Sequence, residues 1–136
     1  MKKLLLTIIL LMPVLISAQG LDSYASYLKN KYPIEYERTI KKHAMDKWKD
    51  NYEMVVYEIN EQADAWFGLL EELEPDNAAI FYKAIKKWGY KGYESSNRET
   101  LLKKDGSLLK NLFSLHCNWN MVKYEFDNQL ESKNSF

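Results

Sequence analysis

Residues Tyr52–Glu61 read YEMVVYEINE, and the spacing of apolar side chains through this stretch decides the fold class. A half-buried β-strand places apolar residues at every second position, whereas residues 54–57 are apolar in succession. On both sides of them, apolar residues recur every three or four positions, with a mean of about 3.7 that is close to the α-helical period. This stripe consists of Ile40, Ala44, Trp48, Tyr52, Val55, Ile59, Ala63, Trp66, Leu70 and Leu73. The stretch is therefore predicted to be helical, with Tyr52, Val55 and Ile59 facing the core.

The helical segment around this stretch extends from about residue 35 to residue 74. Near its middle, the sequence Asp50-Asn51-Tyr52-Glu53 resembles a capping box, a pattern with which many helices begin. The segment is thus either one bent helix or two helices that meet near Asp50, and the pattern allows both.

Further helices are predicted on both sides of this segment. The first covers residues 23–32, with Asp22 or Ser23 as its N-cap, and Pro33 ends it because the residue before a proline avoids the α region. After the long segment, Asp76 is expected to cap the next helix. The inner face of that helix is expected to consist of Ile80, Phe81, Ala84, Ile85 and Trp88, with Gly89 as its stop.

Two more helices are predicted towards the C-terminus, a short one over residues 97–104 and a long one over residues 107–131. One side of the long helix carries Leu108, Leu112, Leu115, Trp119, Val122, Phe126 and Leu130, and the opposite side Leu109, Phe113, Cys117 and Tyr124. A helix that is apolar on two sides usually has neighbours on both. The sequence therefore predicts an all-α protein, an irregular bundle of about five helices.

The N-terminus has the layout of a secretory signal peptide. Two lysines precede an apolar run over residues 4–15, which is shorter than the roughly 18 residues that indicate a membrane-spanning helix. Cleavage is expected after Ala18, so that residues 1–18 are removed and residues 19–136 form one helical domain. The alternative is an uncleaved anchor. The mature protein is expected to be exported, either periplasmic or secreted, with no membrane span and no lipid anchor.

Charge and cysteine content bear on partners and on the compartment. Without residues 1–18 the chain has 17 basic and 19 acidic residues, a net charge of −2. This balance gives no basic face for nucleic acid and no attraction to anionic lipid. Cys117 is the only cysteine, so it is either buried or pairs with another chain. An exported domain without internal disulfides favours a bacterial origin.

The carboxylates of the opening stretch do not converge. On a helical wheel, Glu53 and Glu58 fall on the two sides of the apolar stripe, and Glu61 lies nearly opposite it. A paired-carboxylate site of the glycosidase kind therefore cannot come from this helix alone. Solvated flanks of an amphipathic helix are the expected role of these acids.

A second face of the same segment is the first candidate for binding. It carries Tyr36, His43, Lys47, Asp50, Met54, Tyr57, Glu61 and Ala65. The residues assigned to a polar binding strip on this face are His43, Asp50, Met54 and Tyr57. In the alternative interpretation, a neighbouring helix with Tyr24 and Tyr27 covers Met54 and Tyr57, because Met and aromatic stripes more often serve packing.

The sequence GYKGYESS, residues 89–96, is the second candidate. Trp88, Tyr90 and Tyr93 surround flexible glycines there, and such rings give a large contact area at low entropic cost. Alternatively, both tyrosines fold back onto the bundle. A polar line on the last helix either lines a groove or forms an exposed seam between helices, and it consists of His116, Asn120, Lys123 and Asp127.

No catalytic residue, metal site or cofactor is expected from the sequence. Its two histidines and one cysteine include a single adjacent pair, His116 and Cys117, and consecutive helical residues point about 100° apart. Motifs for phosphate binding, for haem attachment and for serine nucleophiles are absent. The sequence thus favours a protein that is not an enzyme.

Three functions are compatible with these observations. The leading hypothesis is a small exported helical protein that binds a protein or an envelope glycan without turnover. A carrier would instead hold a small apolar ligand in an enclosed cavity of at least roughly 300 Å³. A cell-wall hydrolase would need two carboxyls about 5 to 9.5 Å apart, such as Glu58 and Glu94. The sequence specifies neither the partner nor the oligomeric state.

Overall fold

The computed structural model describes residues 20–89 and 117–136. Several sequence-based predictions lie outside the described residues, namely the signal peptide of residues 1–18, the loop with Tyr90 and Tyr93, the helix over residues 97–104 and the beginning of the last helix through His116. The whole stretch YEMVVYEINE, by contrast, lies within the described residues.

The regular structure of the described residues is helical, apart from one isolated bridge. In chain order the elements are α3 (Ser23–Lys31), α4 (Pro33–Tyr36), the π-helical segment η1 (Glu37–Lys41), α5 (Lys42–Trp48), α6 (Tyr52–Glu72), the short 3₁₀ helix η2 (Pro75–Asn77), α7 (Ala78–Trp88) and α10 (Trp119–Asn134). The elements α4, η1 and α5 follow one another without a break. Counted as one helix, they bring the described helices to five beside η2, and the predicted all-α bundle is confirmed.

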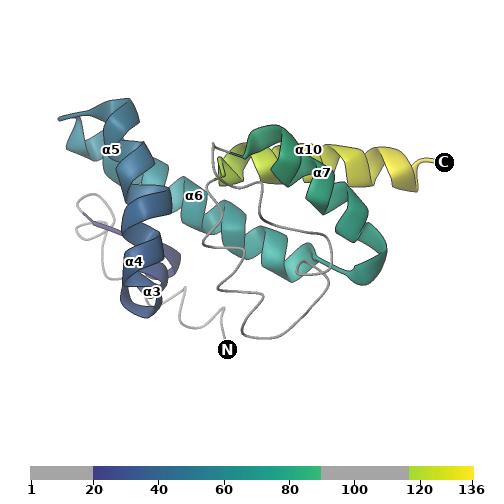
Figure 1. The fold of residues 1–136 in the computed structure, drawn as a ribbon, viewed down its shortest axis with the longest axis horizontal. Coiled ribbons are helices and arrows are strands. Elements are labelled where there is room, and N and C mark those ends of the chain that lie inside the picture. Colours follow the sequence, from purple (N-terminus) through teal and green to yellow (C-terminus); the bar gives the residue numbers. More distant parts are fainter. Residues whose placement is uncertain (1–19, 90–116) are drawn as a thin grey trace, which may run out of the picture.

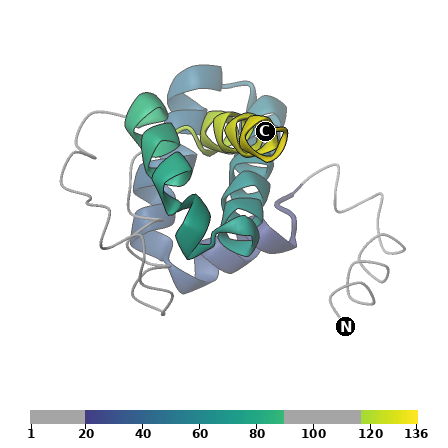
Figure 2. The same cartoon turned by 90° about the vertical axis from the view of Figure 1, so that its right-hand side faces the viewer.

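Helix α6, which contains the stretch YEMVVYEINE, is the long central element (Figure 1). Helix α5 packs against its beginning, α3 crosses it further along, and α10 lies against its second half. Helix α7 packs mainly on α10, which Figure 2 shows nearly end-on with α7 and α6 on its two sides. As predicted for the last helix, α10 thus has neighbours on two flanks.

The core is built from large side chains that α6 shares with its neighbours. The largest fully buried ones are Trp66, Trp119, Tyr36, Phe81, Phe126, Leu28, Ile40, Leu69 and Ile85. Phe81 of α7 meets Phe126 of α10 edge to face, with ring centroids 5.8 Å apart. Such aromatic pairs add about 0.5–1.5 kcal/mol to the stabilisation from area burial alone. The α7–α10 contact is therefore a well-packed part of the fold.

A tight turn separates α5 from α6, so the long segment is two helices rather than one. The Asn51 N–H donates to the Trp48 carbonyl at 3.0 Å, and Lys49 between them has φ 54° and ψ −118°. These angles match the first central position of a type II′ turn. The Asn51 side chain then accepts a hydrogen bond from the Met54 N–H and caps α6. Of the two alternatives left open for this segment, the structure shows two helices that meet near Asp50.

The turn also explains one wrong prediction, that Tyr52 faces the core. Val55 and Ile59 are buried as expected, but Tyr52 is 66% exposed. Tyr52, Val55 and Ile59 all lie within α6, but Tyr52 is its first residue and directly follows the turn. The first residue of α6 consequently projects into solvent.

The starts of α3 and of the helix after it follow the sequence signals, whereas the start of α7 does not. Asp22 is the N-cap of α3, since its carboxylate accepts the Ala25 N–H at 3.0 Å, and Pro33 opens the next helix. The prediction that Asp76 caps α7 is wrong, because the N-cap of α7 is Asn77. Glu74 and Asn77 form a reciprocal capping box instead, because the chain makes one 3₁₀ turn before α7 begins.

The prediction of one continuous last helix is wrong at residues 117 and 118. Cys117 pairs with Gly89 in the isolated antiparallel bridge, and Asn118 is the N-cap of α10. The Asn118 N–H donates to the Trp88 carbonyl at 3.2 Å. The end of α7 is thereby tied to the start of α10, and Cys117 is buried in the contact.

Candidate functional site

A half-open pocket of about 320 Å³ lies between η1, α5, α6 and the two residues before α10. Its lining comprises Thr39, Ile40, His43, Ala44, Asp46, Lys47, Glu58, Gln62, Cys117 and Asn118. The apolar base is formed by Ile40, Ala44 and Cys117, and charged and amide groups surround it. The volume is at the lower end of the range typical of small-molecule sites, about 300–1,000 Å³.

One wall of the pocket is a π-helical segment, the least common of the helical forms. It comprises Glu37–Lys41 and contributes Thr39 and Ile40 to the lining. The Thr39 hydroxyl donates to the Glu35 carbonyl one turn earlier, so this buried side chain is satisfied within its own helix. Single π-helical turns inside α-helices are frequent at functional sites.

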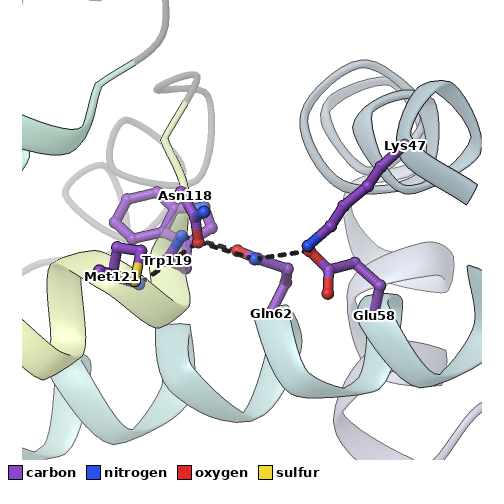
Figure 3. Close-up of polar contacts among 6 residues, drawn as sticks. All are labelled: Lys47, Glu58, Gln62, Asn118, Trp119 and Met121. Atoms are coloured by element: carbon purple, nitrogen blue, oxygen red, sulfur yellow. Dashed lines mark hydrogen bonds and ion pairs between the residues drawn. The ribbon is translucent and has the colours of Figure 1, made fainter.

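A chain of polar contacts crosses the pocket from α5 to α10 (Figure 3). Lys47 Nζ lies 3.5 Å from Glu58 Oε1, and the same oxygen is 3.5 Å from Gln62 Nε2. Glu58 and Gln62 are one turn apart on α6, which places both on the side that faces the pocket. Glu58 is the more sheltered partner, with 14% of its side chain exposed against 56% for Lys47.

Gln62 connects this chain to the beginning of α10. Its Nε2 donates to Asn118 Oδ1 at 3.0 Å, and its Oε1 accepts the Trp119 N–H at 2.6 Å. Asn118 Oδ1 also accepts the Met121 N–H at 3.3 Å as the helix cap. A buried amide that meets both of its partners fixes their relative position. Gln62 therefore holds the start of α10 in register with α6 (Figure 3).

The acids in the pocket lining are paired with lysines. Asp46 accepts a hydrogen bond from Lys42 at 2.7 Å, and this partner lowers the pKa of its carboxyl. Glu58 has Lys47 and Gln62 as partners. The lowered pKa makes the Asp46 carboxyl a poor proton donor at neutral pH.

Cys117 contributes a thiol to the pocket but not a nucleophile. Burial raises the pKa of the Cys117 thiol to about 12, so it stays protonated. The thiolate is the reactive form of cysteine. Of the two fates considered for this residue, the structure shows the buried one.

The residues predicted for the polar strip are not brought together. His43 lines the pocket, whereas Asp50 lies exposed in the turn after α5. Met54 is half-buried, and Tyr57 is 56% exposed on the first turns of α6. The predicted strip requires one continuous helix, but the turn at Lys49 places His43 on α5 and both Met54 and Tyr57 on α6.

The alternative interpretation, in which Tyr24 and Tyr27 cover Met54 and Tyr57, is also wrong. Tyr24 stacks on Phe67 with ring centroids 4.4 Å apart, and Tyr27 meets the same ring edge-on at 5.5 Å. Helix α3 thus covers a part of α6 about three turns beyond Tyr57. Two further members of the wheel face, Tyr36 and Ala65, are buried.

Trp88 is the one residue of the second candidate site that is described. It is half-buried at the end of α7, with the Lys87 ammonium 5.6 Å from its ring centroid. Its carbonyl accepts the Asn118 N–H, so its backbone serves the junction between α7 and α10. Tyr90 and Tyr93 lie outside the described residues.

The described part of the polar line on the last helix forms a seam between α6 and α10. Lys123 Nζ lies 2.9 Å from Asp127 and 3.1 Å from Glu72 of α6. The Lys123 stem passes over Gly68, where an added Cβ would lie 2.8 Å from the Lys123 Cε. Of the two interpretations of this line, the structure supports the seam.

Besides the acids of the pocket, three carboxyls lie close together where α3 meets α6, those of Asp22, Glu61 and Asp64. Burial, and then the neighbouring carboxyls of Asp22 and Glu61, raise the pKa of Asp64 to about 7. Asp64 shares a hydrogen bond with Asp22, which is already the cap of α3. This pair lies on α3 and α6, away from the residues that line the pocket.

Three important residues of the pocket were missed in the sequence, namely Thr39, Gln62 and Asn118. Gln62 stands between apolar neighbours of the α6 stripe, and a polar residue at such a flank is a weak signal for a buried hydrogen bond. Its partners are 56 and 57 positions away in the chain. No periodicity within one helix reports a pairing at that separation.

Searches for other kinds of site and for relatives add no assignment. In residues 20–89 and 117–136, no helix has both the length and the apolar character to cross a membrane. Nor does that part of the chain hold a group of three His, Cys, Asp or Glu side chains suited to a metal ion. The chain matches no protein-family model, no curated protein and no solved structure.

Proposed function

We propose that this chain is a small exported protein that binds an envelope glycan without turning it over, through the pocket between α5 and α6. The observation that carries the proposal is the pocket lining itself. It combines an apolar base with polar groups that are already held in place by one another. Groups that are ordered before binding lose less entropy when a ligand arrives.

The chemistry of the pocket supports binding without catalysis. Its acids are paired with Lys42 and Lys47, and its thiol is protonated. A glycoside hydrolase needs one carboxyl that stays protonated to act as general acid. The hydrogen bond from Lys42 lowers the pKa of the Asp46 carboxyl and so opposes its protonation.

The carrier hypothesis has less support. A carrier of apolar ligands requires an enclosed apolar cavity, and the pocket between α5 and α6 is half-open with charged walls. Placing an apolar ligand there would cover Glu58 and Lys47 without replacing their contacts with water, which is costly.

A protein partner is the second candidate, because two large side chains project from the start of α6. Tyr52 and Tyr57 are both more than half exposed, beside the half-buried Met54. Exposed tyrosines are common in protein-contact surfaces. If this surface binds the partner, Tyr57→Ser weakens the interaction and a change inside the pocket does not.

Export is tested by the N-terminus of the protein that cells release. Expression of the full chain in a Gram-negative bacterium, followed by mass spectrometry of the periplasmic and secreted fractions, should give a product that begins at Gln19. Full-length chain retained in the membrane fraction would contradict export with cleavage.

Binding is tested by co-sedimentation of the purified exported chain with isolated cell-wall glycan. The chain should sediment with the glycan without releasing new reducing ends. His43→Trp places a large ring in the pocket and should abolish co-sedimentation. Met45→Trp is the matched control on the exposed side of the same helix and should retain it. New reducing ends would indicate an enzyme, and equal binding by both variants would exclude the pocket.

A further inference from the structure

We infer that the ligand of this pocket is an uncharged sugar ring, recognised by the Glu58 carboxylate, and that the pocket rejects anionic sugars. The inference rests on the proposed function and names the chemical class of the ligand. Its basis is the charge, hydrogen-bonding capacity and shape of the lining.

The charge of the lining disfavours anions. Asp46 is already paired with Lys42 at 2.7 Å, so Glu58 is the carboxylate of the lining that faces Lys47 across the pocket. Lys47 is mostly exposed and stands 3.5 Å from Glu58, a long contact that neutralises the sheltered Glu58 carboxylate only in part. A carboxylate or phosphate on the ligand would therefore meet a like charge next to Glu58.

The Glu58 carboxylate retains a free acceptor position. Both contacts of this residue within the described part of the chain, with Lys47 and Gln62, are made to Oε1. A carboxylate has about four lone-pair positions on its two oxygens. The Oε2 atom is thus available to accept an O–H from a ligand, and hydrogen bonds to a charged acceptor are roughly twice as strong as neutral ones.

The base of the pocket suits the apolar face of a ring. Ile40 and Ala44 are almost fully buried and line the pocket, and the Cys117 thiol lies with them. A sugar ring presents C–H groups on its faces and hydroxyls around its edge. One such ring can cover the apolar base while its hydroxyls meet Glu58, Lys47 and Asn118, a combination that an aliphatic ligand lacks.

The test compares matched monosaccharides by isothermal titration calorimetry on the exported chain. Glucose and N-acetylglucosamine should bind, whereas glucuronate and glucose 6-phosphate should bind at least tenfold more weakly. Because neutral ligands carry no charge to screen, their affinity should hardly change with added salt.

The variant that isolates the recognition step is Glu58→Gln. It keeps the side-chain shape and an acceptor for Gln62 and Lys47, but it replaces the free carboxylate oxygen by a donor. Affinity for the neutral sugars should fall about tenfold to a hundredfold, the loss expected for a hydrogen bond to a charged group. The weak affinity for glucuronate should rise. Glu53→Gln, an exposed carboxylate on the same helix, should change neither affinity.

The outcomes separate this inference from the proposed function. If glucuronate binds as well as glucose, or if Glu58→Gln leaves the neutral affinity unchanged, the ligand class is wrong. Even if the ligand class is wrong, the pocket remains the binding site when the unsubstituted chain sediments with cell-wall glycan and His43→Trp does not. If no sugar binds and His43→Trp has no effect on co-sedimentation, both proposals fail.

Discussion

The two ends of helix α6 are built on different principles. Its second half lies against α10, which together with α7 buries rings such as Trp119, Phe81 and Phe126 almost completely. Its first half meets α5 across a half-open pocket with paired charges. Well-packed apolar contacts give stability, whereas satisfied polar groups around a cavity give a place for a ligand at some loss of packing. We therefore expect the packed end to stabilise the fold, and we propose the other end, called the binding end below, as the place where a ligand binds.

Gln62 stands at the boundary between the two ends. It contacts Glu58 on the pocket side and both Asn118 and Trp119 on the α10 side. The division between a stabilising end and a binding end can therefore be tested by substitutions on each side of this residue and at the residue itself.

The largest effect is expected at the packed end. Phe126→Ala removes a fully buried ring that meets Phe81, and it should lower the free energy of unfolding by about 4 kcal/mol. Tyr52→Ala at the other end removes an exposed ring and should change it by less than about 0.5 kcal/mol. Urea denaturation followed by circular dichroism measures both. Similar losses for the two variants would remove the distinction between the ends.

A smaller effect is expected at the boundary. Gln62→Leu keeps the volume but leaves the Trp119 N–H without its acceptor, and it should lower the free energy of unfolding by about 2 kcal/mol. Hydrogen exchange of the Trp119 amide should accelerate more than that of residues late in α10. Gln129→Leu on the exposed side of α10 is the control. Unchanged protection of the Trp119 amide would show that Gln62 does not hold the two ends together.

The contact between α3 and α6 is expected to depend on pH. The pKa of Asp64 is raised to about 7, so the folded state binds a proton more tightly than the unfolded chain. This contribution to stability is fully present below about pH 4 and is lost as the pH rises through about 7. Asp64→Asn should therefore stabilise the protein by about 1 kcal/mol at pH 8 and should have no effect at pH 4. The effect at pH 8 is modest because the Asp64 carboxyl is only partly buried and solvent screens its charge.

Thermal unfolding of the two proteins across this pH range measures the difference. Asp127→Asn, on the α6–α10 seam, should not reproduce the same pH profile. A stabilisation by Asp64→Asn that is equal at pH 4 and pH 8 would contradict the protonation argument.

The smallest effect is expected at the turn that begins the binding end. Lys49 adopts a positive φ that suits glycine, so Lys49→Gly should stabilise the fold by about 0.5 kcal/mol after the extra entropy of glycine in the unfolded chain is subtracted. Lys49→Ala retains a Cβ and should give no gain. Denaturation midpoints decide between them, and equal midpoints for the two variants would show that the turn is not strained.

Much of the fold could be predicted from local signals. The period of the apolar stripe gives α6, Asp22 gives the start of α3, and Pro33 gives the boundary that follows. The capping-box pattern from Asp50 to Glu53 indicates the position of the joint between α5 and α6, although the cap itself is Asn51, one residue later. Each of these signals acts within about one helical turn, so a few neighbouring residues are sufficient to predict where a helix begins or ends.

The pocket could be predicted only in fragments. His43 was identified as a polar residue of interest, but its partners across the pocket come from α6 and from residues 117 and 118. The wheel that grouped His43 with Asp50 and Tyr57 required a straight helix through Lys49, and the type II′ turn there changes the direction of the chain. Contacts made after such a turn depend on tertiary packing, which the spacing of residues does not encode.

The most direct test of the central claim is an NMR titration of the isotope-labelled exported chain with N-acetylglucosamine. Shift changes should concentrate on the pocket residues, above all His43, Glu58, Gln62 and Asn118, while the amides of α7 and the second half of α10 stay unchanged. In Glu58→Gln these changes should disappear at the same ligand concentration. Shift changes centred on Tyr52 and Tyr57, or none at the pocket under conditions where the sugar is in large excess, would contradict the assignment of the binding end.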